Sequence, residues 1–295
     1  MTQRPAPPDE ATSAHALLFW AVQLFESKGI ETARLDAELL LAHALGWRRL
    51  ELYARGDEAL SPDACGRFAE LAHARGERVP AKYLLGEAEF FSLPLAVDSR
   101  VLVPRPETEL LVERALELLP EDGPAPVADL GTGSGAIAIA VGAQRAAASI
   151  VATDVSPDAL EVARANAERH GLGGRIEFRL GDWFAALDPR ARFDAILSNP
   201  PYVATADLEA AMPEVREHEP RLALEGGPDG LACLRRLVAG GASWLRPGGW
   251  LIVEIGAGQR PAVEALAEAA GTYETIDVKP DYQGMPRVVS MQTDR

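Results

Sequence analysis

An asparagine, two prolines and a tyrosine follow one of the apolar segments of the chain, as Asn199-Pro200-Pro201-Tyr202. The asparagine side chain offers a carbonyl acceptor, the backbone carbonyl of Pro200 offers another, and the tyrosine offers a flat ring. Proline has a fixed φ and no N–H, so the loop is stiff and carries no competing donor. Two acceptors and one ring suit a planar –NH₂ group, with both hydrogens held and the ring stacked on its plane.

Such binding fixes the orientation of the nitrogen and opposes delocalisation of its lone pair. An amide or arylamine nitrogen is scarcely basic, so a strong methyl donor such as a sulfonium can react with the neutral nitrogen. The proton then leaves afterwards, which agrees with the lack of an obvious catalytic His or Cys. The loop chemistry alone does not distinguish an amide from a nucleobase amine, and an Asn-Pro dipeptide also favours a simple turn.

A glycine-rich segment, Gly131-Thr132-Gly133-Ser134-Gly135, follows an earlier apolar segment. Glycines at this place let the backbone approach a ligand at a helix N-terminus. Asp154 ends the next apolar segment, where its carboxylate can accept hydrogen bonds from a ribose diol. Asp154 could also cap the following helix, but Ser156 and Pro157 already supply a good helix start, which makes Asp154 freer for a ligand. The pattern also fits the loose dinucleotide fingerprint, so several nucleotide cofactors remain open at this point.

Asp182 and Trp183 follow a third strand candidate. The acid can accept the exocyclic amine of an adenine and the ring can cover its face, although a tryptophan at this place also suits a core. The carboxyl ends of parallel strands meet at one edge of a sheet, and ligands bind there. We therefore expect these residues and Asn199 to share one site.

The elements that must position this site alternate between strand and helix from about residue 124. Strands are predicted at 126–130, 149–154, 175–180, 193–198, 250–256, 273–278 and 287–292, with helices at 135–145, 157–170, about 228–245 and 260–270. This order predicts an α/β fold with a mostly parallel seven-stranded sheet and helices on both faces. The last two strands have no helix between them, so a hairpin giving one antiparallel edge strand is expected.

Helical periodicity dominates before this region. We expect a disordered, proline-rich leader at 1–10, a helical bundle at 11–85, a β-hairpin linker at 86–104 and the α/β domain at 105–295. Ser61 and Pro62 show the N-cap and first-position residues of one helix in the bundle.

The composition excludes several function classes. The chain has 295 residues, which suits two domains, and a net charge of −15, which argues against binding along a nucleic-acid track. Its two cysteines, Cys65 and Cys233, lie far apart and show no metal-ligand spacing, so we expect no metal and a reducing cytoplasm. No apolar run is long enough to span a bilayer, so no membrane association is expected.

Several of these segments resemble class I S-adenosylmethionine-dependent methyltransferases, among them "DLGTGSGAIAIA", "GDWF" and "SNPPYV". The segments "VLVPRPETELLVE", "EVREHEPRLALEGGPDGL", "VEIGAGQ", "DYQGMPRVV" and "ARLDAELLLAHALG" are similar to the PrmC/HemK family. The resemblance covers nearly the whole chain after the leader. One departure is His218, where family members often have Tyr.

The resemblance implies a Rossmann-like protein-(glutamine-N5) methyltransferase that uses S-adenosyl-L-methionine. Its expected substrate is the glutamine of the Gly-Gly-Gln motif of class I peptide chain release factors. Residues 131–135 would line the methionine part of the donor, Asp154 would hold its ribose, and Asp182 and Trp183 its adenine. Asn199 would lie between donor and amide, and Asn199–Tyr202 would form the glutamine pocket, with Asn199, Pro200 and Tyr202 catalytic.

Two further residues are weaker candidates for substrate binding. Arg105 would shape the pocket mouth or be a solvated loop arginine. Phe91, with Phe90, would line the substrate cleft or anchor the hairpin to the core.

Other functions stay open on the residues alone. A nucleic-acid amino methyltransferase acting on adenine N6 or guanine N2 would have a similar loop, but the acidic charge and the lack of a basic stripe count against it. A nicotinamide-dependent oxidoreductase would use the glycine loop, but no proton-relay pair for hydride chemistry is visible. A non-catalytic binding module is a third alternative. We expect a cytoplasmic monomer that acts on release factors, without nucleic acid as substrate.

Overall fold

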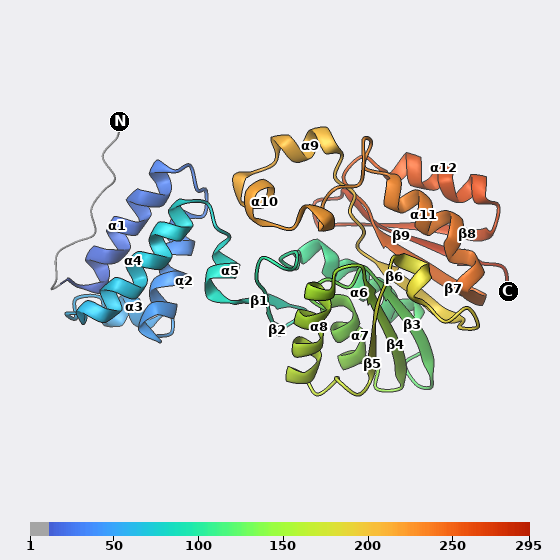
Figure 1. Cartoon of the computed structure of the whole chain (residues 1–295), viewed down its shortest axis with the longest axis horizontal. Helices are drawn as coiled ribbons and strands as arrows, with labels where there is room; N and C mark the ends of the chain where they lie inside the picture. The colour runs from blue at the N-terminus through green and yellow to red at the C-terminus, as the bar shows by residue number, and fades with distance from the viewer. Residues whose placement is uncertain (1–11) are drawn as a thin grey trace. The chain divides into compact units, whose positions relative to one another are not determined.

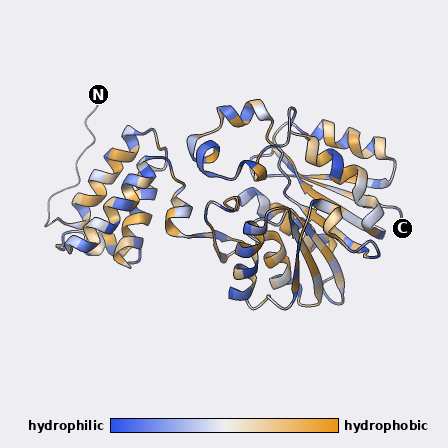
Figure 2. Ribbon diagram, viewed as in Figure 1, coloured by the Kyte–Doolittle hydropathy of each residue, from blue (hydrophilic) through white to orange (hydrophobic). Residues whose placement is uncertain are grey.

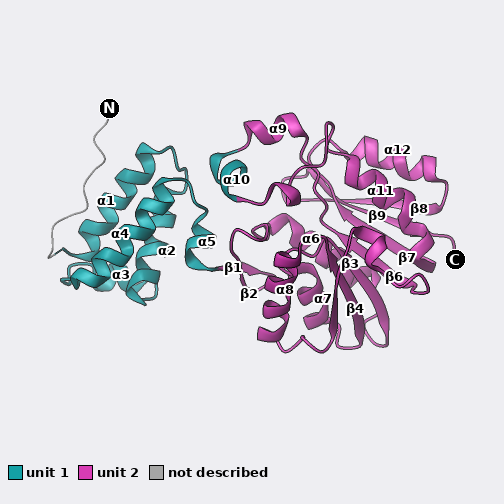
Figure 3. Ribbon diagram, viewed as in Figure 1, with its two compact units in different colours: residues 1–86, 212–218 teal, residues 87–211, 219–295 magenta. Residues whose placement is uncertain are grey.

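A computed structural model describes residues 12–295, and the predicted disordered leader at 1–10 lies outside the described residues. The chain forms two compact units (Figure 3). The first contains the described residues up to Gly86 together with Met212–His218, and the second contains Glu87–Ala211 and Glu219–Arg295. The chain therefore leaves the second unit for one short segment, which the sequence patterns did not predict.

The first unit is helical, as predicted. Its helices are α1 (Ala14–Ser27), α2 (Ala33–Leu45), α3 (Glu51–Ala54), α4 (Pro62–Gly76), α5 (Ala81–Leu85) and α10 (Pro213–His218) (Figure 1). The hydroxyl of Ser61 accepts a hydrogen bond from the Ala64 N–H and begins α4, and Pro62 is its first residue. The helices carry both hydrophobic and hydrophilic residues (Figure 2), and the apolar ones, such as Phe25 and Phe68, form the buried core of the unit.

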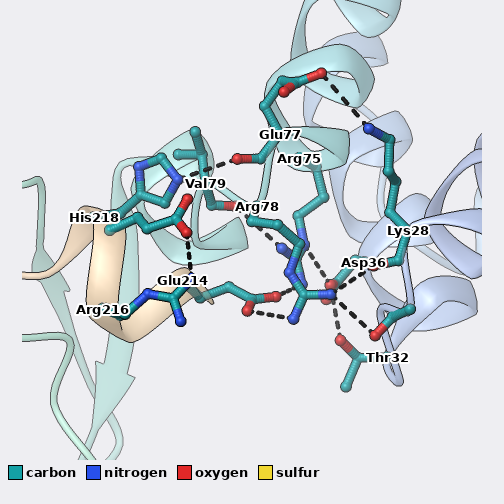
Figure 4. A network of polar contacts seen from close by, with 12 residues as sticks. Lys28, Thr32, Asp36, Arg75, Glu77, Arg78, Val79, Glu214, Arg216 and His218 are labelled. Atoms are coloured by element: carbon teal, nitrogen blue, oxygen red, sulfur yellow. Dashed lines mark hydrogen bonds and ion pairs between the residues drawn. The ribbon is translucent and has the colours of Figure 1, made fainter. Parts of the chain in front are cut away.

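A network of buried charges also belongs to the first unit (Figure 4). The guanidinium of Arg75, on α4, lies 2.8 Å from Asp36 Oδ2 on α2 and 2.9 Å from Glu214 Oε1 on α10. Arg78 contacts the other oxygen of Glu214, and the hydroxyl of Thr32 donates to Asp36. The segment Met212–His218 is therefore tied to the bundle by charge.

The second unit begins with a hairpin of β1 (Glu87–Phe90) and β2 (Leu93–Ala96), which are antiparallel. Phe91 and Ser92 turn the chain with φ of 51° and 61°. A larger sheet follows, with strand order β5-β4-β3-β6-β7-β9-β8. Its strands are β3 (Ala125–Leu130), β4 (Ala148–Asp154), β5 (Ile176–Leu180), β6 (Phe193–Ser198), β7 (Leu245–Glu254), β8 (Tyr273–Pro280) and β9 (Pro286–Thr293).

The predicted seven-stranded, mostly parallel sheet is confirmed, with one correction. The antiparallel strand is β9, and it lies between β7 and β8, so it is not an edge strand. The physical reason is burial, because β9 carries a run of buried residues, Val288–Met291, whereas most residues of β8 are exposed or half-buried. The more apolar strand of the hairpin takes the internal position.

Helices cover both faces of this sheet, and each face has its own buried cluster. One cluster includes residues of α6 (Pro106–Leu118), α7 (Ala136–Gln144) and α8 (Pro157–Arg169), and the other includes residues of α11 (Ala232–Gly241) and α12 (Arg260–Ala270). The connections contain α9 (Thr205–Ala210) and the 3₁₀ turns η1 (Trp183–Ala186), η2 (Arg221–Ala223) and η3 (Ala242–Trp244). Within residues 12–295, no helix combines the length and apolar character that a bilayer crossing requires.

Candidate active site at the carboxyl ends of the strands

A cavity of about 470 Å³ opens in the second unit where β3, β4, β5 and β6 end. Its walls come from the glycine turn after β3, from Asp154 and the start of α8, from Gly181–Trp183, and from Asn199 and Pro201. Residues between 100 and 108 and between 220 and 236 complete it. The four strand ends singled out from the sequence are therefore brought together around one space.

The glycine turn has a backbone that other residues rarely adopt. Gly131, Gly133 and Gly135 have φ of 74°, 56° and 84°, in the left-handed region. A Cβ on Gly135 would lie 3.3 Å from the Ala163 backbone, so glycine here also lets α7 begin close to α8. A Cβ on Gly131 would lie 3.5 Å from the ring of Trp183, so the ring is placed beside the turn.

Asp154 is the last residue of β4 and its carboxylate holds the turn. One oxygen accepts from the Gly133 N–H and the other from the Ser156 N–H, both at 2.9 Å. Burial raises the pKa of this carboxyl, against the opposing effect of these N–H groups. Each carboxylate oxygen keeps a second lone pair, which suits the two hydroxyls of a ribose.

The third strand end differs from the expectation in one respect. Asp182 Oδ2 forms an ion pair with Arg236 at 2.7 Å, and both side chains are about half exposed. Trp183 adopts a φ of 50° and lines the cavity. An adenine at this place would therefore meet a carboxylate that is already paired on one oxygen.

The Asn-Pro-Pro-Tyr loop is anchored at both ends. The hydroxyl of Ser198 donates to the Leu130 carbonyl at 2.7 Å and fixes the loop beside the glycine turn. The amide nitrogen of Asn199 donates to the hydroxyl oxygen of Thr108 at 3.0 Å. The Tyr202 hydroxyl donates to Glu254 at 3.0 Å, and its pKa is raised by burial and by the Glu254 charge.

Some predicted site residues lie elsewhere. Among the described residues that line this cavity, Asn199 and Pro201 are present, but Pro200, Tyr202 and Phe91 are not. Pro200 is buried, and Tyr202 packs beside β7, where a Cβ on Gly256 would lie 3.1 Å from its ring. Phe91 packs against the core of the sheet, and its N–H donates to Glu109 at 2.8 Å.

Arg105 lines the cavity and is oriented by a buried acid. Its guanidinium contacts Glu219, whose side chain is 1% exposed. Burial raises the pKa of Glu219, and the Arg105 charge opposes that rise. Arg105 is therefore held in place at the cavity wall by a specific partner.

Three buried residues that shape the site, Asp129, Thr108 and Glu254, were not predicted from the sequence. Asp129 Oδ2 accepts from the Thr132 hydroxyl at 2.6 Å and from the Ala138 N–H at 3.2 Å, so it organises the glycine turn. Burial raises the pKa of Asp129 to about 7. Thr108, which also lines the cavity, accepts from Asn199, and Glu254 accepts from Thr108 and Tyr202. An acid inside an apolar strand candidate, at 126–130 and 250–256, was the available signal for both carboxylates.

A mostly parallel sheet with a glycine turn after its first strand, an acid ending the second, and Asn-Pro-Pro-Tyr after the fourth defines a class I S-adenosylmethionine-dependent methyltransferase. A crystal structure of a methyltransferase from Pyrococcus furiosus has the same fold, with a TM-score of 0.52 and 16% identity over 70% of this chain and 91% of that one.

The sequence comparisons are more specific. Residues 16–86 match the PrmC N-terminal domain and residues 107–227 match the methyltransferase small domain. The chain is 43% identical to the release factor glutamine methyltransferase of Geobacter sulfurreducens, over 98% of both chains. It is 46% identical to that of Moorella thermoacetica, over 90% of this chain and 94% of the relative. The chain belongs to the release factor glutamine methyltransferase family, which confirms the predicted family.

Proposed function

We propose that this protein transfers a methyl group from S-adenosyl-L-methionine to the side-chain amide nitrogen of the glutamine in the Gly-Gly-Gln motif of class I peptide chain release factors. The observation that carries the proposal is the shared cavity, which joins the glycine turn and Asp154 to Asn199 and Pro201. A donor site and an acceptor site in one space allow direct transfer. The identity to release factor glutamine methyltransferases over nearly the whole chain supports the choice of substrate.

The residues around the glycine turn fit the donor. The turn offers a close backbone approach at residues 131–135, Asp154 offers carboxylate lone pairs for a ribose, and Trp183 offers a ring beside the turn for the adenine. Asp182 contributes its oxygen that is not paired with Arg236. When bound, S-adenosyl-L-methionine supplies an electrophilic methyl group on a sulfonium.

The loop residues act on the glutamine amide. Asn199 lines the cavity and its carbonyl oxygen accepts one amide hydrogen. The Pro200 backbone carbonyl accepts the other, and Tyr202, bonded to Glu254, supports the loop. The amide nitrogen forms the new N–C bond, the C–S bond breaks, and the proton leaves to water afterwards. No base is required, because the nitrogen reacts while neutral. Arg105, which lines the cavity, binds the residues that flank the glutamine.

The remaining parts of the proposal concern partners. The helical unit recognises the release factor away from the Gly-Gly-Gln motif, and the protein acts as a cytoplasmic monomer. Nucleic acid is not the substrate, because a net charge of −15 opposes approach to a phosphate backbone.

The test is mass spectrometry of a class I release factor after incubation with the protein and the labelled donor. The expected result is one methyl group on the glutamine of the motif, and no label on a release factor with that glutamine replaced by alanine. Labelling of DNA or RNA, without labelling of the release factor, would overturn the proposal in favour of a nucleic-acid amino methyltransferase.

A further inference from the structure

A chain of hydrogen bonds joins the Asn-Pro-Pro-Tyr loop to α6 and β7 inside the second unit. Asn199 Nδ2 lies 3.0 Å from Thr108 Oγ1, which lies 2.6 Å from Glu254 Oε2. The other oxygen of Glu254 accepts the Tyr202 hydroxyl at 3.0 Å. Thr108 and Glu254 are 4% and 1% exposed, so water does not compete for these bonds.

The protons in this chain can be assigned from its chemistry. Burial raises the pKa of the Glu254 carboxyl, whereas the hydrogen bonds from the Thr108 and Tyr202 hydroxyls favour its ionised form. In that form Glu254 only accepts, so both hydroxyls must direct their protons to it. Thr108 has a single proton and therefore presents only a lone pair to Asn199. The amide end of Asn199 that faces Thr108 must then be the –NH₂ end. The carbonyl end, Oδ1, is left to face the cavity that Asn199 lines.

We propose that Thr108 and Glu254 are positioning residues that determine which end of the Asn199 amide faces the substrate nitrogen. The proposal rests on the proposed function, in which Asn199 accepts a hydrogen from the substrate –NH₂ group. A flipped Asn199 amide would present its own –NH₂ group to that of the substrate, and two donors cannot bond to each other. The charge on Glu254 therefore sets the orientation at the reacting atom, although Glu254 does not touch it.

Each link can be removed with little change in shape. Thr108→Val replaces the hydroxyl by a methyl group and leaves Asn199 without its fixed acceptor. Glu254→Gln introduces a donor, and when that donor faces Thr108 the threonine proton turns to Asn199 and selects the flipped amide. Misplacement of a reacting group costs up to ~100-fold in rate, so we expect kcat to fall ~10–100-fold in both variants. The Kd for S-adenosyl-L-methionine should change less than about twofold, since neither residue belongs to the proposed donor contacts.

Three comparisons separate positioning from a merely structural role. Thr108→Ser keeps the hydroxyl and should recover most of the activity that Thr108→Val loses. Thr293→Val is the matched control, because it also removes a buried threonine hydroxyl, one that donates to the Arg246 carbonyl on β7. This variant should retain wild-type kcat. The double variant of Thr108 and Glu254 should lose less than the product of the single losses, since both act through one amide.

The experiment measures kcat and KM for a release factor, the Kd for the donor by calorimetry, and the thermal midpoint of each variant. Wild-type kcat in Thr108→Val, or equal losses in the valine and serine variants, would overturn the positioning role. Two other results would also overturn it. One is a loss of activity that only tracks the fall in thermal midpoint from variant to variant, and the other is a loss in the double variant equal to the product of the single losses. Failure of the wild-type protein to methylate the glutamine would instead overturn the proposed function, so the two failures are distinguishable.

Discussion

The charge network in the helical unit leads to a quantitative stability prediction for Arg75→Met. Arg75 is 4% exposed and bridges the carboxylates of Asp36 and Glu214. Methionine fills a similar space but leaves Asp36 buried without its cation, bonded to the Thr32 hydroxyl at 2.8 Å. Removing one member of a buried ion pair costs about 3–5 kcal/mol, because the other charge stays buried without its partner.

The size of the shift follows from the usual denaturant dependence. With a slope of roughly 2 kcal/mol per molar urea, the unfolding midpoint of this unit should fall by ~1.5–2.5 M. Glu214→Gln should cost less, about 1–3 kcal/mol, because Arg75 keeps Asp36 and the Val79 carbonyl as acceptors. Urea unfolding followed by tryptophan fluorescence measures the change, since Trp20 and Trp47 lie in this unit.

The control is Arg48→Met, which makes the same replacement at a side chain that is 86% exposed and lies 3.5 Å from Glu51. Exposed pairs of this kind contribute little, so its midpoint should stay near the wild-type value. If Arg75→Met lowers the midpoint no more than Arg48→Met does, then the buried network does not stabilise the bundle and the reasoning is wrong.

Three other changes test the second unit. Asn199→Ala should abolish methyl transfer while S-adenosyl-L-methionine still binds, and a variant with full activity would remove the role given to the Asn199 amide. Asp154→Ala should mainly raise the donor Kd in calorimetry; an unchanged Kd would exclude the ribose contact. Burial raises the pKa of Asp129 to about 7 in the folded protein, above the usual carboxyl value of about 3.8. Between those values the folded state holds a proton that the unfolded state has lost, so Asp129 makes wild-type stability fall as pH rises from about 4 to 7. Asp129→Asn should flatten this part of the profile of unfolding free energy against pH, and an unaltered slope would show that Asp129 does not titrate there.

Much of the fold could be predicted because periodicity and strand order are local signals. The alternation of strands and helices after residue 124 predicted the sheet, and the motifs predicted the family. The position of β9 could not be predicted from the hairpin alone, since either strand of a hairpin can be the edge. The segment Met212–His218 joins the helical unit through Glu214, and no periodic pattern reports a contact 139 residues away in the sequence, from Arg75 to Glu214.

The candidate site shows the same limit. Asp154 could be predicted as a site residue because it ends a strand whose apolar pattern is clear in the sequence. Thr108 lies 91 residues from Asn199 and 146 residues from Glu254, so their hydrogen bonds exist only once the sheet is assembled. Pro201 lines the cavity, while Tyr202 contacts Glu254, because the turn of a proline pair does not determine the direction of the following side chain.

The sheet order explains why two buried acids can organise two halves of one site. Strand β6, which delivers Asn199, lies between β3 and β7. On one side, Asp129 of β3 holds Thr132 and the start of α7, which shape the glycine turn for the donor. On the other side, Glu254 of β7 holds Thr108 and Tyr202, which shape the loop for the amide. Asp129 and Glu254 hold different groups, so loss of Asp129 should act on donor affinity and loss of the Glu254 charge on kcat. Each half of the site can therefore be perturbed without the other.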